Sequence, residues 1–286
     1  MLRDPSLEPE FGWLLDNREL DDPSRHPFGE PQGAWVVDAG EGLAGFASLL
    51  RFAAASGTWR LLRVAVRGPH RRRGLGRALA RQALEGPHAT GDAALKISHW
   101  EPSDAGEPFA RALGFEHERF FWTMERPGRV APEVAWPAGI EARAFDGGDA
   151  AFQDWCDSYN RAFASNEMSI DATVEQCRAL AAEPHFDRSG MILTYRAGRC
   201  VGFCRLGVHA DHGDLDVLGV VPEERGIGLG RALVRWGAAW LIGRNAPSVR
   251  LTVDGENDRA LALYRSEGFE IVRTRRIWRK PAHARG

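Results

Sequence analysis

Two short segments of the chain carry the residue types of a phosphate-binding turn. They are Val66–Leu79, VRGPHRRRGLGRAL, and Val220–Leu233, VVPEERGIGLGRAL, and they align without a gap at an offset of 154 residues. In each segment a strand-like run leads through R-x-x-G-x-G into a helical pattern. Glycines let backbone N–H groups turn toward phosphate oxygens, and the helix adds the positive end of its dipole. The repeat therefore predicts two anion-binding loops of one kind.

Proton-transfer groups accompany only the second loop. Asp214 and Asp216 are two residues apart on the strand before it, so we expect both on one face. Tyr264 follows Asn257 by seven residues, about two helical turns, so both can face one ligand. Acyl transfer to an amine needs a group that takes a proton and one that helps the leaving group depart. The corresponding positions of the first copy hold Arg60, Leu62, Ser103 and Ala110.

Each of these candidates also has a purely structural interpretation. The aspartates can simply solvate the end of a strand, and Tyr264 can simply pack on its helix. His209 and His212 on the preceding turn are interpreted as solvated loop histidines, with a substrate contact as the alternative. Trp236 and Trp240 fall on the apolar face of the following helix and are assigned to core packing. The basic run of residues 70–73 in the first copy is either a phosphate contact or a surface patch.

The two loops resemble the acetyl-CoA signature of the GNAT (Gcn5-related) acetyltransferases, R/Q-x-x-G-x-G/A. The later pattern N-x-x-A-x-x-L-Y…GF of that family is also present, from Asn257 to Phe269. The resemblance covers nearly the whole second half and most of the first. The tandem layout, with GDLDVLGVVPEERGIGLGRAL in the second half, is similar to the mycothiol synthases, which acetylate an aminoglycoside thiol. In those enzymes the segment reads roughly G-E-x-Y-V-L-G, with a catalytic glutamate where Asp214 stands.

This resemblance implies acetyl-CoA as the acetyl donor and assigns roles to single residues. Asp214 is the expected general base, acting through water, with Asp216 as the second choice, and the Tyr264 hydroxyl protonates the departing thiolate. The strand before the loop is expected to bulge around Leu218–Val220 to pair with pantetheine, which Asn257 also contacts. The expected coenzyme contacts are Leu218, Gly219, Val220, Arg225, Gly226, Ile227, Gly228, Leu229, Gly230, Arg231 and Asn257, and in the first copy Val64, Val66, Arg71, Arg72, Arg73, Gly74, Gly76 and Arg77.

The implied function is an N-acetyltransferase that acts on a primary amine of a small molecule by direct attack in a ternary complex. No cysteine occupies a recognisable nucleophile position, which disfavours an acetyl-enzyme, and no metal site is expected. One alternative is a mycothiol synthase proper, acting on the cysteinyl-glucosamine-inositol precursor. The other is a coenzyme A sensor or interaction module without catalysis. We expect the first copy to be degenerate, retaining coenzyme A binding without turnover.

The elements that must position these residues occur twice in the same order. The second half predicts strands at 191–195, 200–208, 214–221, 248–253 and 270–278, and helices at 150–163, 171–182, 228–242 and 257–267. Such a mixture indicates an α/β fold (an α+β sandwich), here two tandem GNAT folds, each a mixed, mostly antiparallel sheet flanked by helices. The predicted domains are 1–127 and 138–286, with the proline-rich residues 128–137 as the linker.

Composition narrows the class of protein. The 286 residues carry a net charge of −2 and are 44% hydrophobic, which gives no overall attraction to nucleic acid and no membrane-spanning run. The four cysteines lack metal-type spacing and are expected to be reduced thiols, and ordinary burial is expected for Cys200 and Cys204. We therefore expect a cytoplasmic enzyme without nucleic-acid or membrane partners. It is expected to be a monomer with pseudo-dimeric domains or a weak homodimer.

Overall fold

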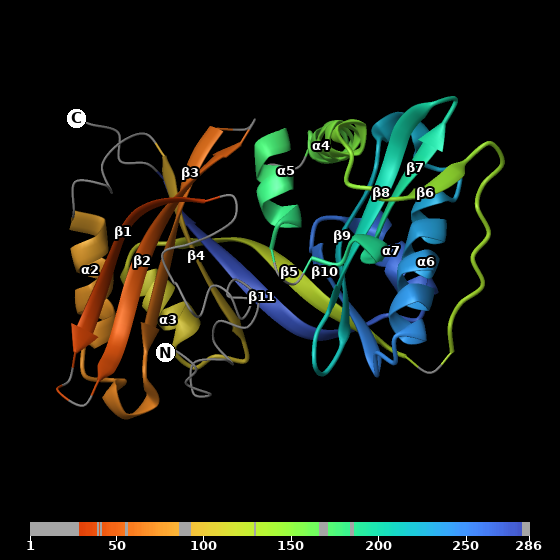
Figure 1. Ribbon diagram of the computed structural model, residues 1–286. Helices are drawn as coiled ribbons and strands as arrows, with labels where there is room; N and C mark the ends of the chain where they lie inside the picture. Colours follow the sequence, from red (N-terminus) through yellow and green to blue (C-terminus); the bar gives the residue numbers. More distant parts are fainter. Residues whose placement is uncertain are drawn as a thin grey trace. The chain divides into compact units, whose positions relative to one another are not determined.

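The computed structural model describes residues 29–38, 40, 42–54, 57–85, 93–128, 130–165, 171–183 and 186–281. They form two compact units. Unit 1 holds the described residues up to Phe120 together with those from Thr274 onward, and unit 2 spans Phe121–Arg273. Each unit is a mixed, mostly antiparallel sheet flanked by helices (Figure 1), as the sequence predicts. No helix among the described residues is long and apolar enough to cross a membrane.

Unit 1 has the strand order β1-β2-β3-β4-β11, in which only β3 and β4 are parallel. Helices α2 and α3 contribute Leu79, Ala80 and Ala110 to one core with Leu49 and Leu62 of the sheet, so both cover the same face. Apart from β11, whose range follows below, its elements are β1 (Glu30–Asp38), β2 (Leu43–Ala54), β3 (Gly57–Val66), α2 (Leu75–Glu85), β4 (Ala94–Glu101) and α3 (Gly106–Ala112).

Unit 2 repeats this plan and has two helices, α4 and α5, between β6 and β7, where the described part of unit 1 has none. Its strand order is β5-β10-β9-β8-β7-β6, in which only β9 and β10 are parallel. The sequence-based boundaries of the elements from α4 onward agree with the structure within a few residues. The elements are β5 (Glu116–Pro127), β6 (Glu141–Ala144), α4 (Asp149–Phe163), α5 (Val174–Ala181), β7 (Met191–Arg196), β8 (Arg199–Val208), β9 (Gly213–Val220), α6 (Leu229–Gly243), β10 (Ser248–Asp254), α7 (Asp258–Ser266) and β11 (Glu270–Lys280).

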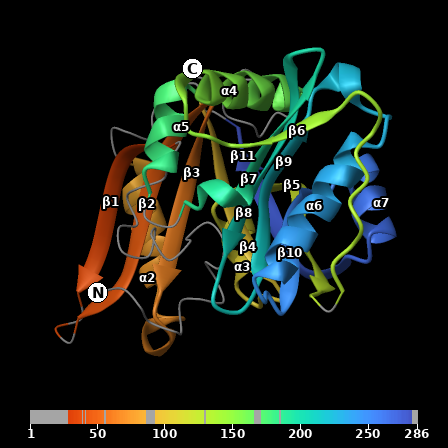
Figure 2. The ribbon, with the colours of Figure 1, turned by 45° about the vertical axis from the view of Figure 1, so that its right-hand side comes forward.

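The two faces of the unit 2 sheet are covered by different helices (Figure 2). Phe203 of β8 packs against aromatic side chains of α4, whereas its neighbour Cys204 lies beside Gly237 of α6. Successive residues of a strand face opposite sides of its sheet, so α4 and α6 cover opposite faces. Trp236 and Trp240 are half-buried against the core on the α6 side, which confirms their assignment to packing.

The closing strands of the two units are exchanged. The second half of β5, Phe121–Pro127, pairs with β10 in unit 2, and Thr274–Lys280 of β11 pairs with β4 in unit 1. Trp278 of β11 is completely buried in the core of unit 1, and Met124 of β5 is completely buried in the core of unit 2. The sequence-based domain ranges 1–127 and 138–286 stay a prediction. The compact units divide the chain after Phe120 and after Arg273 instead. The predicted linker holds no regular element over residues 130–137.

The exchange makes a prediction about which unit each buried aromatic side chain stabilises. Trp278→Ala removes a fully buried ring from the core of unit 1 and should cost about 3–5 kcal/mol there. Hydrogen exchange followed by mass spectrometry should then show faster exchange in β2 and β3 than in β7 and β8. The matched variant Phe269→Ala, in the core of unit 2, should reverse that order. Faster exchange of β7 and β8 in Trp278→Ala would contradict the exchange of strands.

Candidate active site

The candidate site of unit 2 lies where two parallel strands separate. Strands β9 and β10 pair at Gly213, Asp214 and Leu215 of β9, after which both strands continue. On its other edge β9 stays paired with β8 up to Val220. At Leu218–Val220, which are predicted coenzyme contacts, β9 therefore has no backbone pairing with β10. Helix α6 begins just after this segment, at Leu229.

The bulge predicted around Leu218–Val220 is located earlier in the strand. These residues pair in regular register with Cys204, Phe203 and Gly202 of β8. The register shift falls between Asp214 and Val217 instead, opposite Arg205 and Gly207. The prediction of its position was wrong, because separation from β10 already frees the edge that a bulge was expected to provide.

The glycine loop of unit 2 has the geometry that its sequence implies. Gly226 and Gly228 both have φ near +91°, a left-handed conformation that glycine adopts without strain, and Gly228 caps α6. A Cβ atom built on Gly228 would meet nothing within 4 Å, so the space in front of the loop is open. A Cβ on Gly230 would lie 3.6 Å from Leu263 and 4.0 Å from Val220. The loop, the end of β9 and α7 thus converge on one place.

The signature arginine braces the loop in both units. Arg225 donates from Nε to the Val220 carbonyl at 3.1 Å, and Arg71 makes the same bond to Val66 at 2.8 Å. Arg225 also donates from Nη2 to the Ala162 carbonyl at 2.7 Å, which ties the loop to the end of α4. Each arginine therefore holds the shape of its glycine loop by hydrogen bonds and also contributes a positive charge to it.

The other predicted coenzyme contacts of unit 2 lie around the same loop. Arg231 is paired with the buried Glu267 at 3.1 Å, which also accepts from Arg235 at 2.8 Å. Leu229 is buried in the core, whereas Ile227 is exposed on the loop. Asn257 caps α7 by accepting the Ala260 N–H at 3.1 Å, as its sequence position predicts.

Tyr264 lies on α7 and is half-buried against the core. Its ring meets Phe269 edge to face, with ring centres 6.0 Å apart. Burial raises the pKa of the Tyr264 phenol to about 12, so the hydroxyl remains a proton donor throughout the physiological pH range. In unit 1 the corresponding residue is the buried Ala110, which has no hydroxyl.

The two candidate bases of β9 have different partners. Asp214 lies 3.3 Å from His209 Nε2 and 3.5 Å from His212 Nε2, and Asp216 lies 3.7 Å from Arg205. Burial alone would raise the pKa of Asp214, but the hydrogen bonds from both histidines outweigh it and lower that pKa. The hydrogen bond to Asp214 raises the pKa of His209. The histidines assigned to a solvated loop therefore contact the first-choice base, a contact signalled by the spacing H-x-x-H-x-D.

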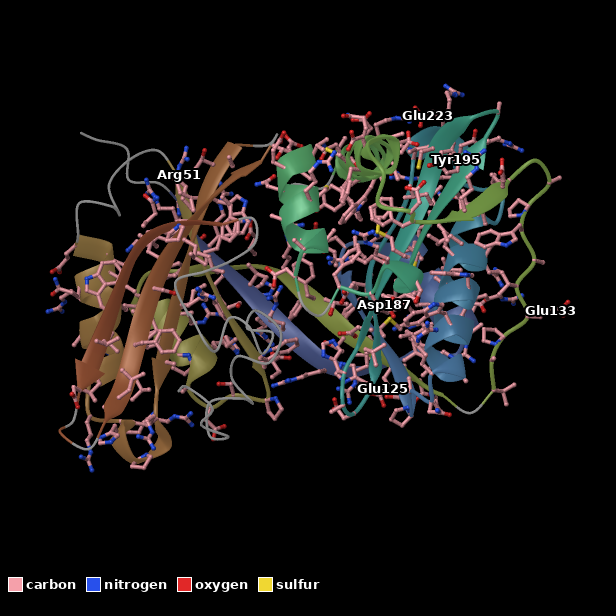
Figure 3. The ribbon with its side chains drawn as sticks, in the orientation of Figure 1. Arg51, Glu125, Glu133, Asp187, Tyr195 and Glu223 are labelled. Carbon is pink, nitrogen blue, oxygen red and sulfur yellow. The ribbon has the colours of Figure 1, made fainter. Side chains whose placement is uncertain are left out.

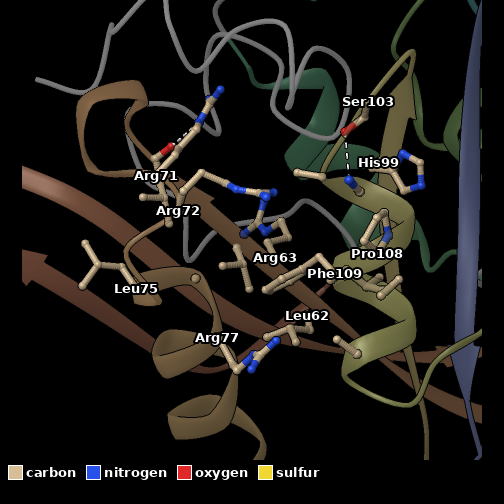
Figure 4. Close-up of a pocket in the computed structure, with 18 of the residues that line it drawn as sticks. Leu62, Arg63, Arg71, Arg72, Leu75, Arg77, His99, Ser103, Pro108 and Phe109 are labelled. Atoms are coloured by element: carbon tan, nitrogen blue, oxygen red, sulfur yellow. Dashed lines mark hydrogen bonds between the residues drawn. The ribbon is translucent and has the colours of Figure 1, made fainter.

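Unit 1 holds a cavity of about 570 Å³ at its own strand separation (Figure 4). Strands β3 and β4 pair only at Trp59, Arg60 and Leu61 of β3 before they separate. Ligand pockets in proteins have volumes of roughly 300–1,000 Å³, so the cavity suits a small molecule. The first-copy residues predicted to contact coenzyme line it, except Arg73. The lining includes Val64, Val66, Arg71, Arg72, Gly74, Gly76 and Arg77, with Arg63, His70, His99, Ser103 and Phe109.

The glycine loop of unit 1 has the same neighbours as the glycine loop of unit 2. A Cβ on Gly76 would lie 3.5 Å from both Val66 and Phe109, the counterparts of Val220 and Leu263 at the offset of 154. Ser103 accepts the Gly106 N–H at 2.9 Å, as Asn257 does at the start of α7. Among the described residues, four arginines and no acidic residue line the cavity, so this lining is cationic.

The cysteines offer no nucleophile to either site. All four are buried and free. Desolvation raises the pKa of Cys177 to about 12, and it raises the pKa of the other three thiols as well. Thiols of this kind are inert. The burial of Cys200 and Cys204 confirms the prediction made for that pair, and the raised pKa values support direct transfer; the reduced state stays a prediction.

Comparison with protein families decides the class of enzyme. The model of the Acetyltransferase (GNAT) family matches residues 3–115 and again residues 152–269. The chain belongs to the GNAT acetyltransferase family. Its two matches coincide with the two glycine loops, so the duplicated segment of the sequence is a duplicated GNAT acetyltransferase fold and the protein is an N-acetyltransferase.

Two relatives that match most of the chain have the same name. The chain is 36% identical over 256 residues to a mycothiol acetyltransferase of Thermobispora bispora, covering 85% of this chain and 82% of that one. It is 40% identical over 210 residues to the mycothiol acetyltransferase of Thermomonospora curvata, covering 72% and 69%.

Solved structures share the fold at lower identity. A GCN5-related N-acetyltransferase from Sphaerobacter thermophilus superposes with a TM-score of 0.70 at 24% identity, covering 88% of this chain and 82% of that one. A tandem GNAT protein from the clavulanic acid biosynthesis pathway also gives a TM-score of 0.70, at 19% identity, covering 92% and 86%. Both agree with a tandem GNAT architecture.

The loop of GNAT unit 1 carries a strained residue where that of unit 2 has glycine. Arg72 has φ of 62°, and the equivalent position of unit 2 is Gly226. A left-handed non-glycine residue costs roughly 1–2 kcal/mol, and added glycine entropy in the unfolded chain offsets roughly half of that gain. Arg72→Gly should therefore stabilise unit 1 by up to about 1 kcal/mol in urea unfolding followed by hydrogen exchange.

The reciprocal variant is the control. Gly226→Arg should destabilise unit 2 by up to about 1 kcal/mol, since it places an arginine in a left-handed conformation and the same entropy difference offsets roughly half of the strain. If both variants shift stability in one direction, backbone strain at Arg72 is not the cause.

Proposed function

We propose that the protein transfers the acetyl group of acetyl-CoA to a primary amine of a small molecule, and that unit 2 does the chemistry. The observation that carries this proposal is a combination that unit 1 lacks at the corresponding positions: an open glycine loop with a half-buried phenol at Tyr264 and a carboxylate at Asp214. The amine attacks directly in a ternary complex. The buried, protonated cysteines support this route over an acetyl-enzyme.

The residues around the loop fit a coenzyme with phosphates. Gly228 leaves open space in front of its Cα, and the N-terminus of the 15-residue helix α6 directs its positive end there. Leu218–Val220 offer backbone groups on the edge released by β10, as the pantetheine arm requires. Gly226, Gly230, Arg231 and Asn257 complete the surroundings of this space. Acetyl-CoA supplies the acetyl group there as an activated thioester.

Two side chains handle the protons of the transfer. Asp214 accepts, through water, the proton that an amine loses when it forms an amide. His209, at 3.3 Å, stabilises the Asp214 carboxylate between turnovers. Tyr264 donates its hydroxyl proton toward the departing sulfur, a role that its high pKa suits because it stays protonated. Asp216, held by Arg205, is the second candidate for the base.

Unit 1 is proposed to bind coenzyme A without turning it over. Its cavity of about 570 Å³ is lined by four arginines, which suits phosphate groups. Ala110 stands where Tyr264 stands in unit 2, and Arg60 stands where Asp214 does. The cradle is therefore retained without the groups that move protons.

A second candidate is mycothiol acetyltransferase activity itself. The relatives at 36% and 40% identity carry that name, and they favour a cysteinyl-glucosamine-inositol acceptor. The aspartate at position 214 is the observation against this candidate, because that family's segment has a glutamate there and the aspartate carboxylate reaches less far. Assays that compare this precursor with simple amino sugars and polyamines, by mass of the acetylated product, separate the two proposals. Coenzyme binding without acetylation of any of these amines would favour the sensor alternative.

The roles of the two proton-transfer groups are tested by conservative variants. Asp214→Asn and Tyr264→Phe should each lower kcat by about 10²–10⁴-fold with little change in coenzyme affinity, because each removes proton transfer and keeps the shape. Arg71→Ala, in unit 1, should leave kcat largely intact. Steady-state kinetics and coenzyme titration make the measurement. Full activity of both variants would exclude the assigned roles.

The pKa of Tyr264 predicts how its contribution depends on pH. Because this pKa is raised to about 12, the phenol is still protonated where an ordinary tyrosine near 10 begins to ionise. The ratio of kcat between wild type and Tyr264→Phe should therefore stay constant from about pH 7 to pH 10. A ratio that falls toward one near pH 10 would show an unshifted phenol.

A further inference from the structure

Two histidines and an aspartate converge on the turn between β8 and β9. His209 and His212 flank a tight turn closed by the bond from the His209 N–H to the His212 carbonyl at 2.9 Å. Their Nε2 atoms lie 3.3 and 3.5 Å from the same oxygen of Asp214, Oδ2. The ligand atoms of all three side chains lie within 4.8 Å of one another. The two rings are stacked, with centres 4.6 Å apart.

The two histidine–aspartate distances match the distance between neighbouring ligand atoms on one metal ion. Zinc binds histidine nitrogen and carboxylate oxygen at about 2.0–2.2 Å, so two such ligands at a tetrahedral angle stand about 3.4 Å apart. Both histidine–aspartate distances are within about 0.1 Å of that value. Two of the three ligand–ligand distances thus suit a single ion, and the third, between the two histidine nitrogens, is no longer than 4.8 Å.

The surroundings of His212 orient its other nitrogen toward the ion. Asp211 Oδ1 lies 2.7 Å from His212 Nδ1, and a proton on Nδ1 satisfies that contact. Nε2 then faces the Asp214 carboxylate, to which it donates a hydrogen bond when protonated, and a metal ion that displaces this proton finds the lone pair directed at it. Metal-bound histidines usually donate their second N–H to a carboxylate in this way.

The local charge also favours a divalent cation. Asp211, Asp214 and Glu125 are negative, and Arg250 is the cation beside them, bonded to Glu125 and 3.4 Å from Asp211. Figure 3 labels Glu125 on β5. Arg250 Nη1 also lies 3.1 Å from His212 Nδ1, and its bonds to the two acids place it outside the ligand set. With neutral histidines this group of side chains has a net charge of −2.

We propose that His209, His212 and Asp214 form a binding site for a divalent transition metal of the zinc type. Two imidazoles and one carboxylate suit zinc and its neighbours, whereas magnesium and calcium prefer oxygen ligands. The side chains of His209, His212 and Asp214 are 34%, 15% and 28% exposed, so an ion can enter from solvent and keep a water ligand. Bound metal takes the Asp214 carboxylate away from proton transfer, so occupancy inhibits the enzyme. This last consequence rests on the proposed function; the binding site does not.

Binding is tested on the full chain without an affinity tag, after treatment with a chelator. Zn²⁺ titrated in competition with a chromophoric chelator should bind at one equivalent per chain, and Co²⁺ should give visible absorption bands of low-symmetry coordination. His209→Ala and His212→Ala should each weaken Zn²⁺ binding by at least about 100-fold, and Asp211→Asn by about 10-fold. His117→Asn, in unit 1, is the matched control and should bind like the wild type.

Three outcomes would overturn the site. They are equal Zn²⁺ affinity in the wild type and both histidine variants, Mg²⁺ binding as tight as Zn²⁺ binding, and a cobalt–thiolate charge-transfer band, which would assign the metal to cysteine. Thermal unfolding of the metal-free variants guards against misfolding. Zn²⁺ should raise the Tm of the wild type and of His117→Asn but not that of His209→Ala.

The inhibitory consequence has its own measurement. Zn²⁺ should lower wild-type acetyl transfer over the range in which it binds, and excess chelator should restore it. The ratio of rates with and without Zn²⁺ should approach one in His212→Ala. Zn²⁺ binding without inhibition would refute Asp214 as the link between the two sites. Zn²⁺ binding in a protein that acetylates no amine would leave the metal site standing and refute the proposed function.

Discussion

In each unit, a parallel pair of strands is joined over three residue pairs and then separates. Because the pairing stops after three residue pairs, the strand ends, the glycine loop and the helix that follows it can form a site in each unit. The short pairing leaves backbone groups of β9 in unit 2 and of β3 in unit 1 unpaired by the neighbouring strand, and in unit 1 a cavity lies beside this edge. A helix begins after this edge in each unit, so its N–H groups and dipole act on whatever binds there. The glycine loop connects the strand to the helix without filling the space.

Duplication has preserved this architecture more strictly than it has preserved chemistry. The bracing bond from arginine to the carbonyl five residues earlier is present in both units, as is the contact of the loop glycine with the strand end. Such features depend on backbone geometry, which most side-chain changes leave intact. The phenol and the carboxylate depend on single side chains, and unit 1 has Ala110 and Arg60 in their places. Under the proposed function, the replacement of these two side chains separates coenzyme binding from turnover.

Much of the fold was predictable because its local signals are strong. The offset of 154 residues predicted equivalent elements, and the caps at Gly228 and Asn257 defined the starts of α6 and α7. The exchange of β5 and β11 was not predictable, because the two closing strands follow the same Gly-Phe pattern and either can complete either sheet. The position of the bulge and the convergence of His209, His212 and Asp214 depend on the exact turn between β8 and β9, which pattern alone does not determine. The catalytic roles of Asp214 and Tyr264 stay predictions.

The exchanged closing strands also set the order in which the molecule is completed on the ribosome. Strand β4 can pair with Thr274–Lys280 only after this segment, in the final described strand, has been synthesised. The segment that unit 2 uses, Phe121–Pro127, is synthesised before the helices of unit 2. The half that is translated first is thus finished last. Truncated products that lack the C-terminal segment would keep an open strand edge on unit 1, and such edges are recognised by chaperones and proteases or lead to aggregation.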